Sequence, residues 1–260
     1  MYPVIFSLGS FSLRSYGAMA AIGFLLAVWS VNRQRKYAAL DSDQTSSLLM
    51  LAMLAGILGA RIFYVVQFYN KEFAGHFGRI FRIDQGGLVF YGGFLLAIGA
   101  IILYCKLKKL DFIRVLDIFT PAIALAHACG RIGCFLNGCC YGKAATVPWG
   151  VSYPPGSYPA QMTDGTPLHP VQLYEAGEMI LLFFLFNYLL KHTRRGVPMS
   201  LYLLIYGCLR FLNELFRGDN PHFLNLFTPA QIIGFLLIPC GIILLIFFLK
   251  NERKTSDIQH

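Results

Sequence analysis

The sequence predicts an all-α integral membrane protein with about seven transmembrane helices. Hydrophobic residues make up 56% of the chain and charged residues only 13%, well below the quarter that is usual in soluble proteins. The mean hydropathy is +0.57. Several stretches approach or exceed the roughly 18 apolar residues of a spanning helix, and they lack the polar face that a soluble helical core needs. These observations favour a polytopic membrane protein.

Seven apolar segments are expected to cross the bilayer, in chain order. They are residues 16–31, 47–68, 88–107, 112–136, 170–190, 199–216 and 229–249. Basic residues lie at or just after the ends of five of these segments, at Arg33, Lys71, Lys106, Lys191 and Lys250. The fourth segment is the least regular because a proline at position 121 and a run of glycines break its pattern. We expect an interrupted or re-entrant helix there, which is tolerated where it lines a polar cavity.

The distribution of basic residues predicts the orientation. Most of the 22 lysines and arginines lie after the first, third and fifth segments and in the C-terminal tail. Positive loops stay on the cytoplasmic side, so the N-terminus is expected outside and the C-terminus in the cytoplasm. The formal charge of +9 is then a topology signal that suits an anionic leaflet and gives no case for nucleic acid. We expect one transmembrane domain over residues 1–260, with 138–169 as a loop or small cap on the outer side.

A polar motif at residues 127–142 lies within or beside an apolar segment. It contains His127, Arg131 and Asn137 together with four glycines. A charge at membrane depth is costly, and such groups usually face a cavity and bind something. The guanidinium of Arg131 is a fixed fork of donors that suits phosphate, and glycines let the backbone approach a ligand closely. The motif therefore predicts a phosphate-bearing substrate that is reached from within the bilayer.

Three further polar clusters are expected on the same side of the membrane. They lie at the start of the third segment (Gly86, Gly87, Tyr91, Gly92, Gly93), the start of the fifth (His169, Gln172, Tyr174, Glu175) and the end of the sixth (Arg210, Asn213, Glu214, Arg217). Arg210 and Glu214 are four residues apart and share a helix face, either as site residues or as a helix-stabilising pair. Four polar clusters at one depth predict a site more strongly than any one of them.

Other interpretations of the same residues stay open. The alternative role of Arg131 is a structural ion pair with Glu175 or Glu178, and a phosphate-binding role is compatible with that pair. His127 is either a base or a hydrogen-bonded core histidine.

Four of the seven cysteines lie in the polar motif, at positions 129, 134, 139 and 140. Their spacing is C-x4-C-x4-C-C and lacks the C-x2-C pairs of a zinc site, so we expect no metal and no cofactor. A disulfide between two of them remains an alternative if they face an oxidising compartment.

Nearly end to end, the chain resembles the prolipoprotein diacylglyceryl transferases, enzymes of the bacterial inner membrane. The resemblance is carried by PVIFSLG from residue 3, YG at 16–17, GAR at 59–61, GG at 86–87, GRIGCFLNG at 130–138, HPVQLYE at 169–175 and RFLNELFR at 210–217. The resemblance implies seven spans with the N-terminus outside. It also implies a multi-pass enzyme of the cytoplasmic membrane with its active site toward the periplasm.

The resemblance implies a reaction as well. Such enzymes move a diacylglyceryl group from phosphatidylglycerol to the thiol of a lipobox cysteine in a prolipoprotein and release glycerol 1-phosphate. This reaction needs a base for the thiol and cations for the leaving phosphate. The expected catalytic residues are Arg131, Arg210, His127 and Glu214. The expected substrate-binding residues are Tyr16, Arg61, Gly87, Tyr91, Asn137, Gly142, Gln172, Glu175 and Arg217.

The chain also departs from the commoner family pattern. Many members have a histidine, often discussed as the base, where this chain has Tyr91, and this sequence resembles a cysteine-type branch. His127 lies four residues before Arg131, on the same helical face, and is the candidate replacement for that base. The alternatives are a transferase with a different phospholipid donor or acceptor and a non-catalytic homologue that binds lipid or lipoprotein. A transporter is disfavoured because the chain has no internal repeat and its polar clusters lie on one side.

Overall fold

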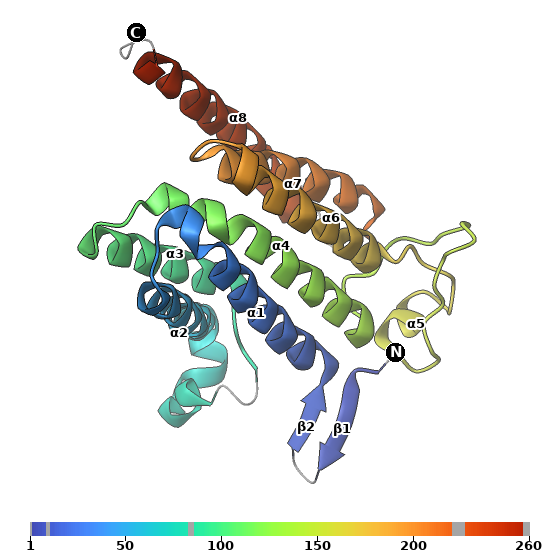
Figure 1. Ribbon diagram of the computed structural model, residues 1–260. Coiled ribbons are helices and arrows are strands. Elements are labelled where there is room, and N and C mark those ends of the chain that lie inside the picture. Colours follow the sequence, from blue (N-terminus) through green and yellow to red (C-terminus); the bar gives the residue numbers. More distant parts are fainter. Residues whose placement is uncertain (1, 9–10, 83–85, 220–226, 257–260) are drawn as a thin grey trace. The chain divides into compact units, whose positions relative to one another are not determined.

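The computed structural model describes residues 2–8, 11–82, 86–219 and 227–256, and helices dominate it (Figure 1). The helices are α1 (Ser15–Gln34), α2 (Ser42–Phe68), α3 (Phe90–Leu107), α4 (Phe112–Asn137), α5 (Tyr158–Met162), α6 (Val171–His192), α7 (Val197–Phe216) and α8 (Pro229–Ser256). Short helical turns η1 (Arg35–Ala38), η2 (Tyr69–Phe73) and η3 (Phe77–Phe81) join some of them. The predicted all-α class is confirmed, apart from an antiparallel hairpin of β1 (Val4–Leu8) and β2 (Phe11–Arg14) that hydropathy did not indicate.

Seven apolar helices coincide with the seven predicted spans. Within the described part of the chain, six helices are long and apolar enough to cross a membrane, and Tyr91–Leu107 forms a shorter apolar helix. The helices extend past the predicted limits where polar groups find partners. The side chain of Asp41, for example, accepts from the amide of Gln44 at 2.7 Å, and Gln44 Oε1 accepts from the amide of Asp41 at 3.2 Å. This capping box begins α2 at Ser42, five residues before the hydrophobic run.

The chain divides into two compact units. The first comprises Met1–Tyr37 and Leu116–His260, and it contains the hairpin, α1, most of α4 and α5 to α8. The second comprises Ala38–Val115 and contains α2, α3 and the turns between them. The single transmembrane domain expected over the whole chain stays a prediction.

Helix α4 runs without a break through Pro121, so the expected interruption of the fourth span is wrong. Proline has no N–H, so in a helix the carbonyl four residues earlier, here that of Asp117, lacks its usual donor. The hydroxyl of Thr120 replaces that donor, because Thr120 Oγ1 donates to Asp117 O at 2.7 Å. The backbone groups of the helix are thereby satisfied at membrane depth, as lipid requires.

The carboxylate of Asp117 joins α4 to the start of α7. Its Oδ2 accepts from the amide of Gly196 at 2.7 Å and its Oδ1 from the amide of Met199 at 3.1 Å. The first amides of a helix have no partner within the helix, so a side chain from another helix satisfies them here. This contact sets the position of α7 against α4.

An apolar cluster packs α4, α6 and α7 together. Its buried members are Ala124, Ala128, Met179, Leu182, Phe186 and Tyr202. The two alanines let the backbone of α4 approach the larger side chains of α6 closely, which is how helices pack in lipid. The cluster lies beside the polar residues of the same three helices and holds them in register.

The segment between α4 and α6 is ordered and has a core of its own. Tyr141, Tyr153 and Leu168 are buried together there. Main-chain bridges join Leu168 to both Ala144 and Val151. The outer-side cap expected at 138–169 stays a prediction.

Candidate active site

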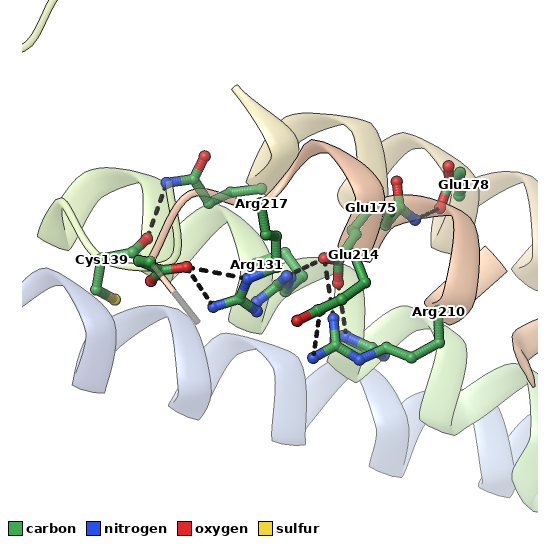
Figure 2. A network of polar contacts seen from close by, with 11 residues as sticks. Arg131, Cys139, Glu175, Glu178, Arg210, Glu214 and Arg217 are labelled. Atoms are coloured by element: carbon green, nitrogen blue, oxygen red, sulfur yellow. Dashed lines mark hydrogen bonds and ion pairs between the residues drawn. The ribbon is translucent and has the colours of Figure 1, made fainter. Parts of the chain in front are cut away.

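A buried carboxylate joins two arginines from different helices at the centre of the first unit. Glu175 on α6 accepts a hydrogen bond from Arg131 on α4 through Oε1, and the same oxygen lies 3.4 Å from Nη1 of Arg210 on α7. Figure 2 shows Glu175 between the two guanidinium groups. Only 3% of Glu175 and 8% of Arg131 is exposed, so the charges meet away from solvent. The ion pair considered from the sequence is therefore present, and Arg210 joins it.

His127 belongs to the same cluster. Its Nε2 lies 3.8 Å from Oε2 of Glu175, the oxygen that does not bond Arg131. The ring packs edge-on against Tyr206, with 5.6 Å between the ring centroids. His127 and Arg131 thus share a face of α4, as their spacing predicts, and both turn toward Glu175.

The polar residues of α7 reach two different acidic residues on α6. Arg210 Nη2 lies 3.5 Å from Oε2 of Glu214, one turn further along α7, and Glu214 is 4% exposed. Asn213 Nδ2 donates to Oε2 of Glu178 at 2.5 Å. Arg210 therefore lies between two carboxylates, Glu175 and Glu214, and Glu178 is held by an amide.

Arg217, directly after α7, pairs with a residue that the sequence analysis did not single out. Its Nε and Nη2 donate to Oδ1 of Asp219 at 3.1 and 2.9 Å. Burial alone lowers the pKa of Arg217, but the charges of Cys140 and Asp219 outweigh it and raise that pKa above its ordinary value. Arg217 and Asp219 lie only two positions apart in the sequence, and this short separation is the signal that could have indicated their pairing.

Main-chain pairing brings the Arg217 segment to the polar motif. Gly142 and Arg217 form an antiparallel bridge, and the amide of Gly142 also donates to the carbonyl of His169 at 3.1 Å. A methyl group at Gly142 would come within 2.5 Å of that carbonyl, so the approach requires glycine. The predicted binding residue Gly142 therefore joins three of the four polar segments through its backbone.

Gln172 holds the loop after α4 in place. It is fully buried, and its Nε2 donates to the carbonyl of Cys139 at 2.8 Å and to the hydroxyl of Tyr153 at 3.1 Å. Burial raises the pKa of Tyr153, although the bond from Gln172 acts in the opposite direction. These contacts place Gln172 in a supporting position beneath the loop.

Tyr16 and Asn137 lie at the ends of their helices in the first unit. Tyr16 is the second residue of α1 and is 47% exposed, and Asn137 is the last residue of α4 and half-buried. An apolar pocket of about 360 Å³ adjoins this end, lined by Tyr2, Ile5, Ser15, Ala18, Met19, Ile22 and Leu136. The pocket lies one to two turns of α4 beyond Arg131 and offers room for a hydrocarbon chain.

Arg61, Gly87 and Tyr91 belong to the second unit. The guanidinium of Arg61 donates to five main-chain carbonyls at 2.7 to 3.0 Å, those of Arg79, Ile80, Arg82, Gly86 and Gly87. An arginine has five N–H donors, so each has an acceptor here. Arg61 therefore stabilises the backbone of the loop that carries these carbonyls. Tyr91 is half exposed in the first turn of α3.

The first unit thus assembles the residues that anion chemistry needs. All four expected catalytic residues contact Glu175 or each other. The Nε of Arg131 is buried and has no hydrogen-bond partner among the described residues. A buried donor without an acceptor is costly, and an anionic ligand is a natural partner for it. Arranged arginines of this kind stabilise charge that develops on a leaving phosphate.

Comparisons with known proteins identify the family. The family model described as prolipoprotein diacylglyceryl transferase matches residues 3–247. A protein of Pseudoalteromonas translucida named phosphatidylglycerol–prolipoprotein diacylglyceryl transferase is 35% identical, over 99% of this chain and 96% of its own length. Proteins of the same name from Clostridium tetani and Mannheimia succiniciproducens are 34% and 36% identical, over 98% and 99% of this chain and 100% and 96% of their own lengths. With the seven apolar helices and the buried arginine cluster, these matches show that the chain belongs to the prolipoprotein diacylglyceryl transferase family.

Proposed function

We propose that the protein transfers a diacylglyceryl group from phosphatidylglycerol to the thiol of a lipobox cysteine in a prolipoprotein. The names of its relatives support the donor lipid and the class of acceptor. The single observation that carries the proposal is the placement of Arg131 and Arg210 on either side of one carboxylate in a buried cluster. We also propose that this cluster lies toward the periplasmic side of the bacterial cytoplasmic membrane.

The proposed reaction is a substitution at the glyceryl carbon that bears the phosphate. The sulfur of the acceptor cysteine forms a new C–S bond, and the C–O bond to the phosphate breaks. The electron pair of that bond leaves on glycerol 1-phosphate, and the thiol proton passes to a base. Arg131 and Arg210 neutralise charge on the leaving phosphate, which acts most strongly where water is excluded.

The two carboxylates give the arginines their positions. Glu175 orients both Arg131 and Arg210, and Glu214 holds Arg210 from the other side. Such partners hold charged groups in place before substrate binds, so little reorganisation is needed during the reaction. His127 contacts Glu175 through one oxygen and is the candidate acceptor of the thiol proton.

The direct test uses purified protein, vesicles of defined phospholipid and a lipobox peptide. We expect the peptide to gain one diacylglyceryl group by mass spectrometry, with glycerol 1-phosphate released in equal amount. A peptide with serine in place of its cysteine is the acceptor control, and phosphatidylethanolamine vesicles are the donor control.

Product from phosphatidylethanolamine alone would favour the transferase with a different donor. Lipid binding without any product from any donor would favour the non-catalytic homologue. As a variant control, Arg33→Ala removes an arginine from the last turn of α1 and should leave the rate unchanged.

A further inference from the structure

Three cysteine sulfurs meet at the end of α4. The Sγ atoms of Cys134, Cys139 and Cys140 all lie within 4.8 Å of one another, and all three residues are free thiols. Among the described residues, no other group of three or more potential metal ligands lies so close together. Cys134 is buried, and the other two are partly buried. The proposed transfer reaction uses none of these thiols.

The backbone after α4 is what returns the second and third thiols to the helix. Gly138 has a φ of 79° and Cys140 a φ of 62°, both in the left-handed region that residues with side chains rarely adopt. The amides of Gly138 and Cys139 donate to the carbonyl of Cys134 at 2.9 and 3.1 Å. The turn therefore brings Cys139 and Cys140 back against the last turn of α4.

Other segments hold this turn from outside. The buried amide of Gln172 donates to the carbonyl of Cys139 at 2.8 Å, and Figure 2 shows Cys139 at the edge of the arginine cluster. The amide of Gly218 donates to the carbonyl of Tyr141 at 3.2 Å. The three thiols are thus positioned by contacts that do not depend on a ligand, which is what a preorganised site requires.

Three thiols at this separation form a donor set for a soft metal. Thiolates select Zn²⁺ and Cu⁺ over hard cations. A Zn–S bond is about 2.3 Å, so sulfurs around one metal lie roughly 4 Å apart. Closing the present separation to that value requires a shift of under about 1 Å, which side-chain rotation supplies.

The charge of the neighbourhood favours thiolates around a cation. Arg131 lies one helical turn before Cys134, and the segment of Arg217 pairs with Gly142, two residues after Cys140. Three thiolates and a divalent ion leave one negative charge, and three thiolates and a monovalent ion leave two. The guanidinium groups on these two segments already pair with Glu175 and Asp219, so they offset part of that excess.

We propose that Cys134, Cys139 and Cys140 form a binding site for one soft, thiophilic metal ion. The ion displaces the thiol protons, which pass to solvent, and no electron transfer takes place. Cu⁺ is satisfied by three sulfurs, whereas Zn²⁺ takes one further ligand such as water. The C-x4-C-x4-C-C spacing argues against a metal because it lacks the C-x2-C pairs of zinc fingers. The folded turn nevertheless brings three of these thiols together in space.

The test measures metal binding by the whole, reduced protein in detergent. Zn²⁺ and, without oxygen, Cu⁺ are each titrated against a competing chelator, and Cd²⁺ is added to read thiolate-to-metal absorption. We expect one ion per chain for Zn²⁺ or Cu⁺ and a cadmium–thiolate band. The triple variant Cys134→Ser, Cys139→Ser, Cys140→Ser should bind at least tenfold more weakly, whereas Cys208→Ser with Cys240→Ser should bind like wild type.

A second measurement needs no variant, so it holds even if the triple variant fails to fold. Bound metal should slow alkylation of Cys139 and Cys140 and leave the exposed Cys208 and Cys240 unaffected. No binding of either ion by reduced wild type overturns the proposal, as does equal alkylation with and without metal. Neither readout involves lipid transfer, so the outcome is independent of the proposed function.

Discussion

Arg131 on α4 and Glu175 on α6 form a buried ion pair across 44 residues of sequence. Removing two charges from water is costly, and a buried pair is retained at that cost only where geometry and further bonds offset it. Here Arg210 and His127 also approach the carboxylate of Glu175. The pair is therefore the organising contact of the site, and variants in it affect stability as well as rate.

Arg131→Ala should abolish transfer. Loss of one well-placed charge stabiliser lowers the rate about 100- to 1000-fold. Arg131→Lys should recover little of the rate because a point charge lacks the fork of donors. Thermal unfolding of both variants separates this effect from misfolding. Breaking a buried ion pair costs up to about 3–5 kcal/mol, and Arg210 and His127 remain beside Glu175 to reduce that cost. A folded Arg131→Ala protein with near-normal activity would rule out the phosphate-binding role.

Arg210 and Glu214 should act as a unit. The two side chains lie 3.5 Å apart, and Glu214 is buried, so each variant alone disturbs the other partner. Transfer rates of Arg210→Ala, Glu214→Gln and the double variant give the coupling free energy, expected at about 0.5–3 kcal/mol. If the losses of the single variants add up to that of the double variant, the residues act independently.

His127→Gln should lower the rate strongly and Tyr91→Phe only mildly. A neutral imidazole accepts a proton and an imidazolium does not, so the wild-type rate should rise with pH as His127 deprotonates. Rates measured across pH should lose this dependence in His127→Gln. An active His127→Gln enzyme with the wild-type pH profile would return His127 to the role of a core histidine beside Tyr206.

Arg61→Lys should loosen the loop it holds without changing the affinity for donor lipid. Lysine has three donors on one atom and reaches few of the five carbonyls that Arg61 contacts. We expect faster proteolysis near residues 79–82 and an unchanged KM for phosphatidylglycerol. A raised KM with unchanged proteolysis would instead support the substrate-binding role that the sequence suggested.

Thr120→Val should destabilise α4. The variant leaves the carbonyl of Asp117 without the hydroxyl that replaces the missing amide of Pro121, a loss of about 1–3 kcal/mol. Thr120→Ser keeps the hydroxyl and is the matched control. Adding Pro121→Ala to Thr120→Val restores an amide donor and should recover the unfolding temperature in detergent. No recovery would mean that the hydroxyl acts in some other way.

The sequence by itself determined the membrane class and the seven helices. Lipid offers no hydrogen bonds, so each apolar run must satisfy its backbone as a helix, and hydropathy reports that local requirement. Local spacing also predicted two pairs that share a helix face, Arg210 with Glu214 and His127 with Arg131. The proline at position 121 predicted an interruption that the helix does not have. The hydroxyl of Thr120 replaces the missing donor, and this contact depends on a side-chain rotamer that residue spacing does not encode.

Only the tertiary structure decided which polar groups meet. Arg61 and Arg131 look alike in sequence, as arginines within apolar segments, yet main-chain carbonyls use every donor of Arg61 while Arg131 joins the Glu175 cluster. The three cysteine thiols likewise come together through the left-handed turn at Gly138 and Cys140. The physical reason is that helix formation follows from local composition, whereas the pairing of buried charges depends on how separate helices and loops pack.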